Sequence, residues 1–299
     1  MSLSLNEAVT PLQVLHDDVL AHADVTVMVK RIDLVHPIIS GNKWYKLKYN
    51  LENAQQQGCR QILSFGGAYS NHIHALAGAC KAIGLDSIGV IRGERSSLLN
   101  DTLKFAEGCG MRLHYLNRAD YRLKDSPKVI HQLQQRFGDF YLLPEGGSNA
   151  LALKGVAELV DELGDDFDLL CCACGSGGTL AGLIAGLAGR KSLEGYSALK
   201  GADFLYGDIR RLLAAGGYQD TDNWGLNLDY HFGGFAKTTP ELLNFIHSFT
   251  ERHDIPLEPL YTGKLFYGLY ERIAQGVYPR GIRIIALHSG GMQGRDSLM

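Results

Sequence analysis

Long apolar runs, a strong charge of one sign and proline-rich stretches are all absent from this sequence. No run reaches the roughly 18 apolar residues that a membrane-spanning helix needs. Lysine and arginine total 29 against 32 aspartates and glutamates, a net charge of −3, which gives no reason to expect an anionic polymer or surface as partner. The first residues lack the basic and apolar regions of a secretion signal. We therefore expect a cytoplasmic protein that binds neither nucleic acid nor membranes.

Cysteine occurs at six positions, three of which fall together in one apolar segment. Cys171, Cys172 and Cys174 lie in or beside residues 169–173, which predict a buried strand. Buried cysteine often behaves as a small hydrophobic residue. His72 and His74 lie two residues apart, so on a helix they point to different sides. These residues do not make up the ligand set of a usual zinc site, and we expect no metal.

The order of apolar and amphipathic segments predicts the fold class. The 299 residues, 45% hydrophobic and 20% charged, are enough to bury large cores in one or two domains. Strands are expected at 25–31, 61–65, 87–92, 112–116, 140–143, 168–174 and 282–288, and helices at 70–83, 98–109, 128–137, 150–163 and 178–188. This alternation predicts βαβ units with parallel sheets, an α/β fold.

The segment SGNKWYKL at 40–47 places Lys43 directly after a Gly-Asn pair. It follows the strand expected at 25–31 and opens a helix-like run. A lysine amine in this position can form a Schiff base with an aldehyde cofactor. Together with segments 66–72 and 175–179, which suit a ring and a phosphate, it indicates an enzyme that depends on pyridoxal phosphate (PLP).

A glycine-rich loop follows the strand expected at 168–174 and precedes a helix. It consists of Gly175, Ser176, Gly177, Gly178 and Thr179. A helix N-terminus offers unpaired N–H groups and the positive end of the helix dipole, which suit a phosphate. The glycines let the backbone approach an anion, and the two hydroxyls add donors. The loop matches neither an NTPase nor a dinucleotide motif, and a tight turn without a ligand is the alternative interpretation.

The segment SFGGAYSNH at 64–72 also joins a strand to a helix. Ser70 and Asn71 occupy its cap region, so helix capping is one interpretation. A cap residue at the carboxyl edge of a sheet also lies where ligands bind in open α/β folds. Asn71 is then placed to donate to the phenolate oxygen of a pyridoxal ring. Ser70 is placed to hold a substrate carboxylate or to move a proton.

Six motifs in a fixed order carry a resemblance that spans nearly the whole chain. They are SGNK at 40–43, GG at 66–67 with SNH at 70–72, PEGGSN at 144–149, GSGGT at 175–179, YTGK at 261–264 and HSGG at 288–291. In this order they resemble the 1-aminocyclopropane-1-carboxylate (ACC) deaminase / D-cysteine desulfhydrase family. That family belongs to the fold-type II PLP enzymes, the tryptophan synthase β-like group.

The resemblance implies which residues hold the cofactor and which face the substrate. Lys43 matches the lysine that carries PLP, and its Gly-Asn context selects it over Lys46 and Lys48. Ser70 and Tyr261 match residues on the substrate side. The other implied cofactor contacts are Asn71 for the ring hydroxyl oxygen, Gly175, Ser176, Gly177, Gly178 and Thr179 for the phosphate, and Thr262 for the pyridine nitrogen.

The resemblance also implies an architecture. It consists of two α/β domains of twisted, mostly parallel sheets flanked by helices, with the cofactor in the cleft between them. We expect a large discontinuous domain at 1–47 and 153–299 and a small inserted domain at 48–152. A homodimer is usual in such a family, so we expect a homodimer here.

Three features depart from the family pattern. ACC deaminases carry a glutamate where Thr262 stands, and a carboxylate near the ring nitrogen favours its protonated form. A threonine hydroxyl cannot do this by charge, and Thr262 matches the D-cysteine desulfhydrase pattern instead. Relatives also carry a Tyr-x-x-Tyr-Gly-like stretch where this chain reads HFGGFAK at 231–237. An active-site tyrosine is therefore missing or displaced, and the chain between Leu180 and Tyr261 is shorter than expected.

These observations predict a PLP-dependent lyase or deaminase that acts on a small amino-acid substrate. The expected reaction is α,β-elimination from D-cysteine or a related D-amino acid, which gives a 2-oxo acid, ammonia and sulfide. Ring opening of ACC to 2-oxobutyrate and ammonia is the alternative reaction. Two other classes stay open: a PLP-binding protein that no longer turns over amino acids, and a phosphate-binding α/β protein without PLP.

Overall fold

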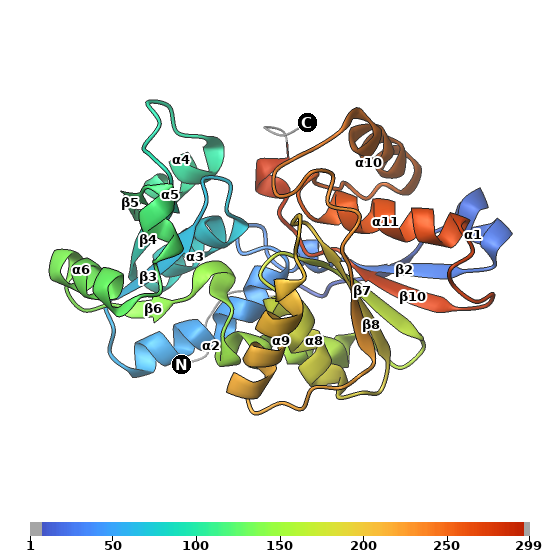
Figure 1. Ribbon diagram of the computed structural model, residues 1–299, viewed down its shortest axis with the longest axis horizontal. Coiled ribbons are helices and arrows are strands. Elements are labelled where there is room, and N and C mark those ends of the chain that lie inside the picture. Colours follow the sequence, from blue (N-terminus) through green and yellow to red (C-terminus); the bar gives the residue numbers. More distant parts are fainter. Residues whose placement is uncertain (1–7, 296–299) are drawn as a thin grey trace.

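The computed structural model of the chain describes residues 8–295, which fold around two separate sheets (Figure 1). The larger sheet has the order β1 (Leu12–Val14), β2 (Thr26–Lys30), β10 (Arg283–Leu287), β7 (Leu169–Cys174), β8 (Ser192–Ser197) and β9 (Trp224–Asn227). The smaller sheet has the order β5 (Arg112–Leu116), β4 (Asp86–Arg92), β3 (Gln61–Gly66) and β6 (Tyr141–Leu143). Only the edge pair β1–β2 is antiparallel among these strands.

Helices flank both sheets, as the α/β class requires. They are α1 (Asp18–Ala23), α2 (Asn42–Gln56), α3 (Asn71–Ile83), α4 (Asp101–Gly108), α5 (Arg118–Arg122), α6 (Pro127–Phe137), α7 (Ala150–Glu158), α8 (Gly178–Leu187), α9 (Phe204–Ala215), α10 (Pro240–His253) and α11 (Thr262–Ala274). Short 3₁₀ turns lie at Ile32–Leu34, Glu145–Gly147, Leu159–Glu162 and Met292–Gly294. No helix in the described part of the chain is long and apolar enough to cross a bilayer.

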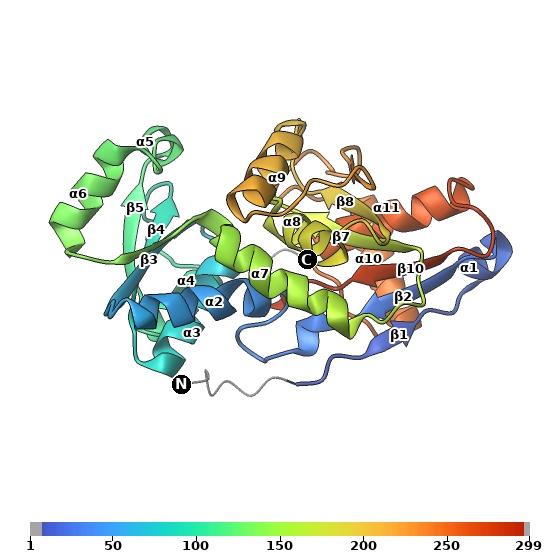
Figure 2. The ribbon, with the colours of Figure 1, turned by 90° about the horizontal axis from the view of Figure 1, so that it is seen from below.

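The chain leaves the large sheet after β2, builds the whole small sheet and returns through α7 to β7. Helices α2 and α7 pack against each other where it passes between the two sheets (Figure 2). This path places the carboxyl end of β7 opposite the carboxyl ends of β3 and β4. Ligands of open α/β folds bind at such edges, so the topology prepares a site between the sheets.

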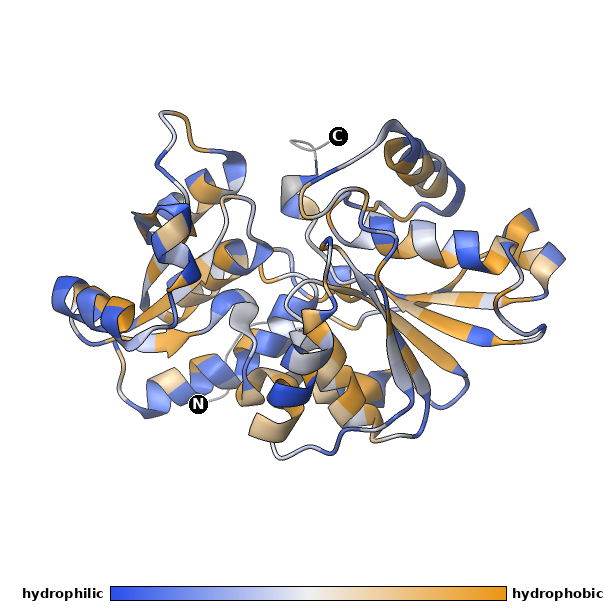
Figure 3. Cartoon of the chain, viewed as in Figure 1, coloured by the Kyte–Doolittle hydropathy of each residue, from blue (hydrophilic) through white to orange (hydrophobic). Residues whose placement is uncertain are grey.

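The strands and helices expected from the sequence are all present, with small shifts at their ends. The helix expected from Leu98 begins instead at Asp101, because the Asn100 side chain accepts a hydrogen bond from the Leu103 N–H at 3.0 Å and caps it there. The helix expected to reach Leu163 ends at Glu158 and continues as a 3₁₀ turn. Hydrophobic residues are concentrated on predicted strands of the large sheet such as β7 and β10 (Figure 3).

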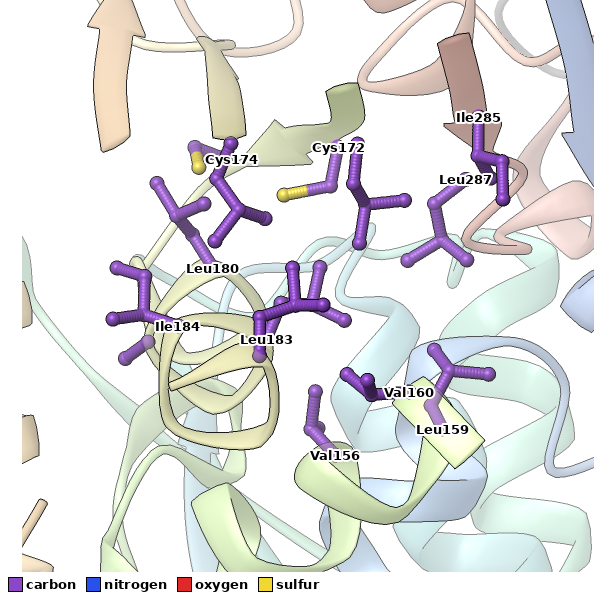
Figure 4. Packing of buried hydrophobic residues seen from close by; sticks show 14 of the residues in the cluster. Val156, Leu159, Val160, Cys172, Cys174, Leu180, Leu183, Ile184, Ile285 and Leu287 are labelled. Carbon is purple, nitrogen blue, oxygen red and sulfur yellow. The ribbon is translucent and has the colours of Figure 1, made fainter. Parts of the chain in front are cut away.

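The two faces of the large sheet pack against different helices. One face meets α7 and α8, where Val156, Leu183 and Ile184 belong to the same apolar cluster as Cys172 and Cys174 of β7 (Figure 4). The other face meets α1, α10 and α11.

The cysteines of β7 follow this division. Cys171 belongs to the second face, and Cys172 and Cys174 belong to the first. Cys171 and Cys174 have C-x-x-C spacing, but the strand turns them to opposite faces, because side chains alternate along it. All three are free, buried thiols. This is the state expected of cysteines that act as small apolar side chains. No cluster of three metal-type ligands occurs within residues 8–295.

Candidate active site

A cavity of about 740 Å³ lies between the two sheets. Its walls come from the start of α2, the turns that follow β3 and β7, the segment after β6, and the start of α11. It gathers Lys43, Ser70, Asn71, Gly175, Ser176, Gly177, Gly178, Thr179 and Tyr261 from the predicted site. Thr262 is the predicted residue that does not line it.

The turn from β7 into α8 forms a cradle for an anion. Its N-cap residue Gly177 has a φ of +74° and makes no side-chain cap. The first N–H groups of α8 therefore have no partner from the capping residue. A Cβ on Gly178 would lie 2.4 Å from Ser148 Oγ and 3.0 Å from Lys46 Nζ. Only glycine leaves that space open, which fits the phosphate of PLP.

Lys46 supplies the positive charge beside this cradle. Its ammonium donates to Ser148 Oγ at 2.7 Å, and the hydroxyls of Ser148 and Ser176 are also 2.7 Å apart. Only 1% of Lys46 is exposed, and burial holds its pKa well below the ordinary lysine value, with the charge of Lys43 adding to the effect. A bound phosphate would provide the missing counter-charge.

Lys46 has no role among the predictions made from the sequence. Its spacing of three residues from Lys43 was the available signal, because i and i+3 share a side of a helix.

Lys43 lies one helical turn earlier and is held ready for covalent chemistry. Its Nζ donates to Asn42 Oδ1 at 3.0 Å, and Asn42 Nδ2 donates to Thr179 Oγ1 at 2.7 Å. Burial lowers the pKa of Lys43 to about 8, while Glu258 opposes the shift. A larger share of the amine is therefore neutral near pH 8 than in an ordinary lysine, and the neutral amine is the nucleophile.

The backbone that leads into Lys43 is fixed by a close contact. Gly41 has a φ of +67°, and a Cβ there would lie 1.9 Å from the carbonyl oxygen of Ser289. The Asn42 N–H donates to the same oxygen at 3.2 Å. Glycine at 41 is thus a geometric requirement of the SGNK motif.

The turn from β3 into α3 presents a hydroxyl and an amide. Ser70 is the N-cap of α3, and its Oγ accepts from the Ile73 N–H at 3.3 Å. Asn71 Oδ1 accepts from Gln293 Nε2. The Asn71 amide N–H₂ has no acceptor within residues 8–295, so it is available to the phenolate oxygen of a PLP ring.

Tyr261 and Thr262 begin α11 but lie in different surroundings. Tyr261 faces the cavity, with its hydroxyl 3.2 Å from the position of a Cβ on Gly175. Thr262 is fully buried behind it. Its hydroxyl donates to Glu258, 3.1 Å from Oε1, and accepts from the Glu258 N–H at 3.0 Å.

Ser289, from the HSGG motif, also carries a hydroxyl group, and unlike Thr262 it lines the cavity. The role of Thr262 toward the ring nitrogen therefore stays a prediction.

The segment 231–237, where relatives are expected to carry a tyrosine, places Phe235 in the cavity wall. Its ring lies 5.9 Å from the ring of Tyr261, centroid to centroid. Tyr230, just before the segment, packs instead beside Gly268 in the core of the large sheet. An apolar ring thus covers Tyr261 on the side where the sequence predicts a missing or displaced tyrosine.

Comparisons with known proteins identify the family of the chain. A family model described as "Pyridoxal-phosphate dependent enzyme" matches residues 3–290. A putative 1-aminocyclopropane-1-carboxylate deaminase of Pyrococcus furiosus is 32% identical, with 95% of this chain and 90% of the relative covered. The bifunctional D-cysteine desulfhydrase/1-aminocyclopropane-1-carboxylate deaminase of Arabidopsis thaliana is 29% identical, with 89% and 72% covered.

A solved structure described as an ACC deaminase homologue has a TM-score of 0.86 at 29% identity, with 99% of this chain and 94% of that one covered. The α/β, fold-type II architecture expected from the sequence is confirmed by this likeness. The matches cover nearly the whole chain, and its motifs surround one cavity. The chain therefore belongs to the pyridoxal-phosphate dependent enzymes, in the family of ACC deaminases and D-cysteine desulfhydrases.

Proposed function

We propose that this enzyme catalyses α,β-elimination from D-cysteine or a related small D-amino acid, yielding a 2-oxo acid, ammonia and, from cysteine, sulfide. The observation that carries the proposal is the neutral side chain of Thr262 at the start of α11, directly behind the cavity-lining Tyr261. Thr262 stands where ACC deaminases carry a glutamate, and Ser289 is likewise neutral. Glu258 lies behind them, but its carboxylate is buried and bonded to the N–H groups of residues 260–262.

PLP, when bound, withdraws electrons from the α-carbon of the substrate and so stabilises the charge that develops there. The chain's residues supply the rest. The N-terminus of α8 and Lys46 would bind the phosphate, and Lys43 would carry the cofactor. With its amine free, Lys43 Nζ would be placed to take the α-proton, and burial lowers its pKa to about 8, which favours the neutral base.

The substrate is held between two hydroxyl groups. Ser70, at the N-terminus of α3, binds the substrate carboxylate together with the helix dipole. Tyr261 lies on the wall formed by α11, where burial raises the pKa of its hydroxyl above the ordinary value. Tyr261 therefore stays protonated near neutral pH, and its O–H would donate a hydrogen bond to the departing sulfur.

The second candidate function is ring opening of ACC, which gives 2-oxobutyrate and ammonia. The names of the Pyrococcus and Arabidopsis relatives support it. Opening a cyclopropane has no leaving group comparable to a thiolate, so it needs a stronger electron sink. A neutral partner at the ring nitrogen does not provide one, which ranks this reaction second.

An assay with D-cysteine, L-cysteine, β-chloro-D-alanine and ACC tests the proposal on PLP-loaded protein. We expect sulfide and 2-oxo acid from D-cysteine, and little 2-oxobutyrate from ACC. Lys43→Ala should lose the borohydride-sensitive visible band and all turnover. Efficient release of 2-oxobutyrate from ACC without sulfide from D-cysteine would reverse the ranking. A visible band without turnover of any amino acid would favour a PLP-binding protein that is not an enzyme.

The proposal includes the organisation of the molecule. We propose a cytoplasmic homodimer, with a large domain at 1–47 and 153–299 and a small domain at 48–152, as the family resemblance implies. Light scattering of the purified protein should give twice the mass of one chain. A mass of one chain at micromolar concentration would contradict the homodimer.

A further inference from the structure

We propose that Arg92 binds an acidic group on the substrate side chain, so that the enzyme prefers D-amino acids with a second anionic group at or beyond the β-carbon. The inference rests on the proposed function, because it concerns the substrate of the same site. D-Cysteine lacks such a group, apart from its thiol, and would then be a smaller relative of the preferred substrate.

Arg92 lies where a ligand would be expected to meet it. It is the last residue of β4, at the carboxyl edge of the small sheet, and it lines the cavity. The five residues before it on the strand are buried, while Arg92 itself is exposed. Ligands of open α/β folds bind at this edge. The position therefore presents a guanidinium to whatever occupies the cavity.

The other cations of the cavity are already engaged. Lys43 and Lys46 serve the cofactor. The remaining ion pairs are Lys124 with Asp125 at 3.1 Å and with Glu145 at 3.4 Å, and Arg211 with Asp208. The Arg92 side chain has no ion pair and no hydrogen bond to any other residue of the range 8–295. Apart from the two lysines assigned to the cofactor, Arg92 is thus the cation among the described cavity residues that is free to pair with an anionic ligand.

The protein holds this guanidinium in place without neutralising it. Its central carbon lies 5.9 Å from the centre of the Tyr121 ring, a cation–π distance. The Tyr121 hydroxyl donates to Glu145 at 2.9 Å, which fixes the ring. On the other side, Arg92 Nη2 lies 3.6 Å from the position that a Cβ on Gly67 would take. A held, planar fork of donors suits a carboxylate.

The place of the α-carboxylate decides which anionic group Arg92 meets. The α-carboxylate of an amino acid is joined to the carbon from which Lys43 takes a proton, and the start of α3 at Ser70 is available to bind it. Arg92 comes from a different element of the cavity wall, the end of β4, where its side chain is exposed beside Tyr121. With the α-carboxylate at α3, we assign to Arg92 an anionic group beyond the α-carbon.

The charge of Arg92 also acts on Tyr261, at the start of α11. Burial raises the pKa of Tyr261, Glu258 and Glu145 add to the rise, and Arg92 opposes it. The side chain of a substrate held between Ser70 and Tyr261 thus passes within the field of Arg92.

A matched pair of ligands tests the proposal. D-Alanine and D-aspartate share every group except the β-carboxylate, and neither has a β-leaving group. Binding to PLP-loaded protein is followed by the change in its visible absorbance. We expect D-aspartate to bind at least about tenfold more tightly than D-alanine, since a charge-assisted bidentate pair is a strong contact. In Arg92→Gln this preference should disappear with the D-alanine affinity unchanged, and Arg92→Lys should restore part of it.

Arg95→Gln is the matched control, because Arg95 is an exposed arginine three residues away that pairs with Glu107 at 3.6 Å and does not line the cavity. It should leave both affinities unchanged. Equal weakening of both ligands in Arg92→Gln would show that Arg92 holds the α-carboxylate, and would overturn the proposal. So would wild-type protein that binds the two ligands equally. Failure of the proposed function is recognised separately, as absent turnover of D-cysteine with the aspartate preference intact.

Discussion

Two strand-to-helix turns that look alike in sequence differ in how their helices begin. Both follow a parallel strand, are rich in glycine and carry hydroxyl residues. At the start of α3, the Ser70 side chain satisfies one of the free N–H groups of the helix. At the start of α8, Gly177 stands at the same place and satisfies none. The uncapped helix keeps its donors for an external anion, and the capped helix presents a rigid edge to the substrate.

The charges behind the two turns differ in the same way. Lys46 lies against the α8 turn as a buried amine, which a bound phosphate would hold in its charged form. His72 lies at the α3 turn, where burial lowers its pKa well below the ordinary value, so it is neutral. Its Nε2 bonds Ser64 Oγ at 2.8 Å, and its buried Nδ1 has no partner within the described residues. A dianion is thus stabilised at one turn, while the other turn orients neutral and singly charged groups.

The largest expected effect comes from filling the uncapped turn. Gly178→Asp adds bulk where Ser148 Oγ would lie 2.4 Å from the new Cβ, and it adds a negative charge beside the phosphate. We expect PLP affinity to fall by about 100-fold or more, and Gly177→Asp to act in the same direction. The measurement is a PLP titration by absorbance. Gly108→Asp, at the end of α4 with open space around it, is the control, and overlaid titrations for all variants would reduce the α8 turn to a structural feature.

Removal of the charge behind the turn should have a smaller effect. Lys46→Met keeps most of the volume but removes the cation, and PLP affinity should fall by about 10- to 100-fold. The pKa of Lys46 is lowered in the folded chain, so its charge opposes folding when no anion is bound. The melting temperature of the PLP-free variant should therefore equal or exceed that of the wild type. Lys48→Met, on the outer side of α2, should leave PLP binding unchanged, and a large loss there would contradict the comparison.

The rate of cofactor capture should depend on pH in a way that reports Lys43. The neutral amine attacks the aldehyde, and its pKa of about 8 replaces the ordinary 10.5. The rate of chromophore formation should therefore rise about tenfold per pH unit below pH 8 and level off above about pH 9. Stopped-flow absorbance measures this rate. A rise that continues to pH 10 would show an unperturbed lysine.

The smallest effect is expected at the capped turn. Ser70→Ala removes the cap of α3, which should cost about 1 kcal/mol of stability, and it should lower turnover more than PLP binding. Ser70→Asn keeps a capping oxygen without the hydroxyl, so it should recover stability but not turnover. Urea unfolding and steady-state assays separate the two effects. If Ser70→Asn restores full turnover, Ser70 acts only as a cap.

The sequence predicted those parts of the fold and site that depend on local pattern. Continuous apolar strands such as β7 and β10 were found because both faces are buried. The strands β8 and β9 were missed, since Gly195 and Gly225 interrupt a weaker pattern. Lys43 was singled out by its Gly-Asn context together with the later motifs, and the structure places it in the cavity wall.

The role of Lys46 was not predicted, because its partner Ser148 comes from a distant segment that only the tertiary fold brings near. Arg92 was missed for a related reason. A terminal arginine of a strand usually faces solvent, and only the second sheet makes its surroundings a cavity.

Because Gly41 contacts Ser289, the backbone around Lys43 can take up its final position only after the C-terminal part of the chain has been synthesised. Gly41 packs against the carbonyl group of Ser289, which follows the last strand, β10. The N–H of Asn42, the first residue of α2, donates to the same carbonyl oxygen. During synthesis on the ribosome, Lys43 therefore emerges long before Ser289, whose carbonyl group fixes the backbone next to it. Such long-range contacts form late in folding. Cofactor capture by Lys43 should thus follow the emergence of β10 from the ribosome.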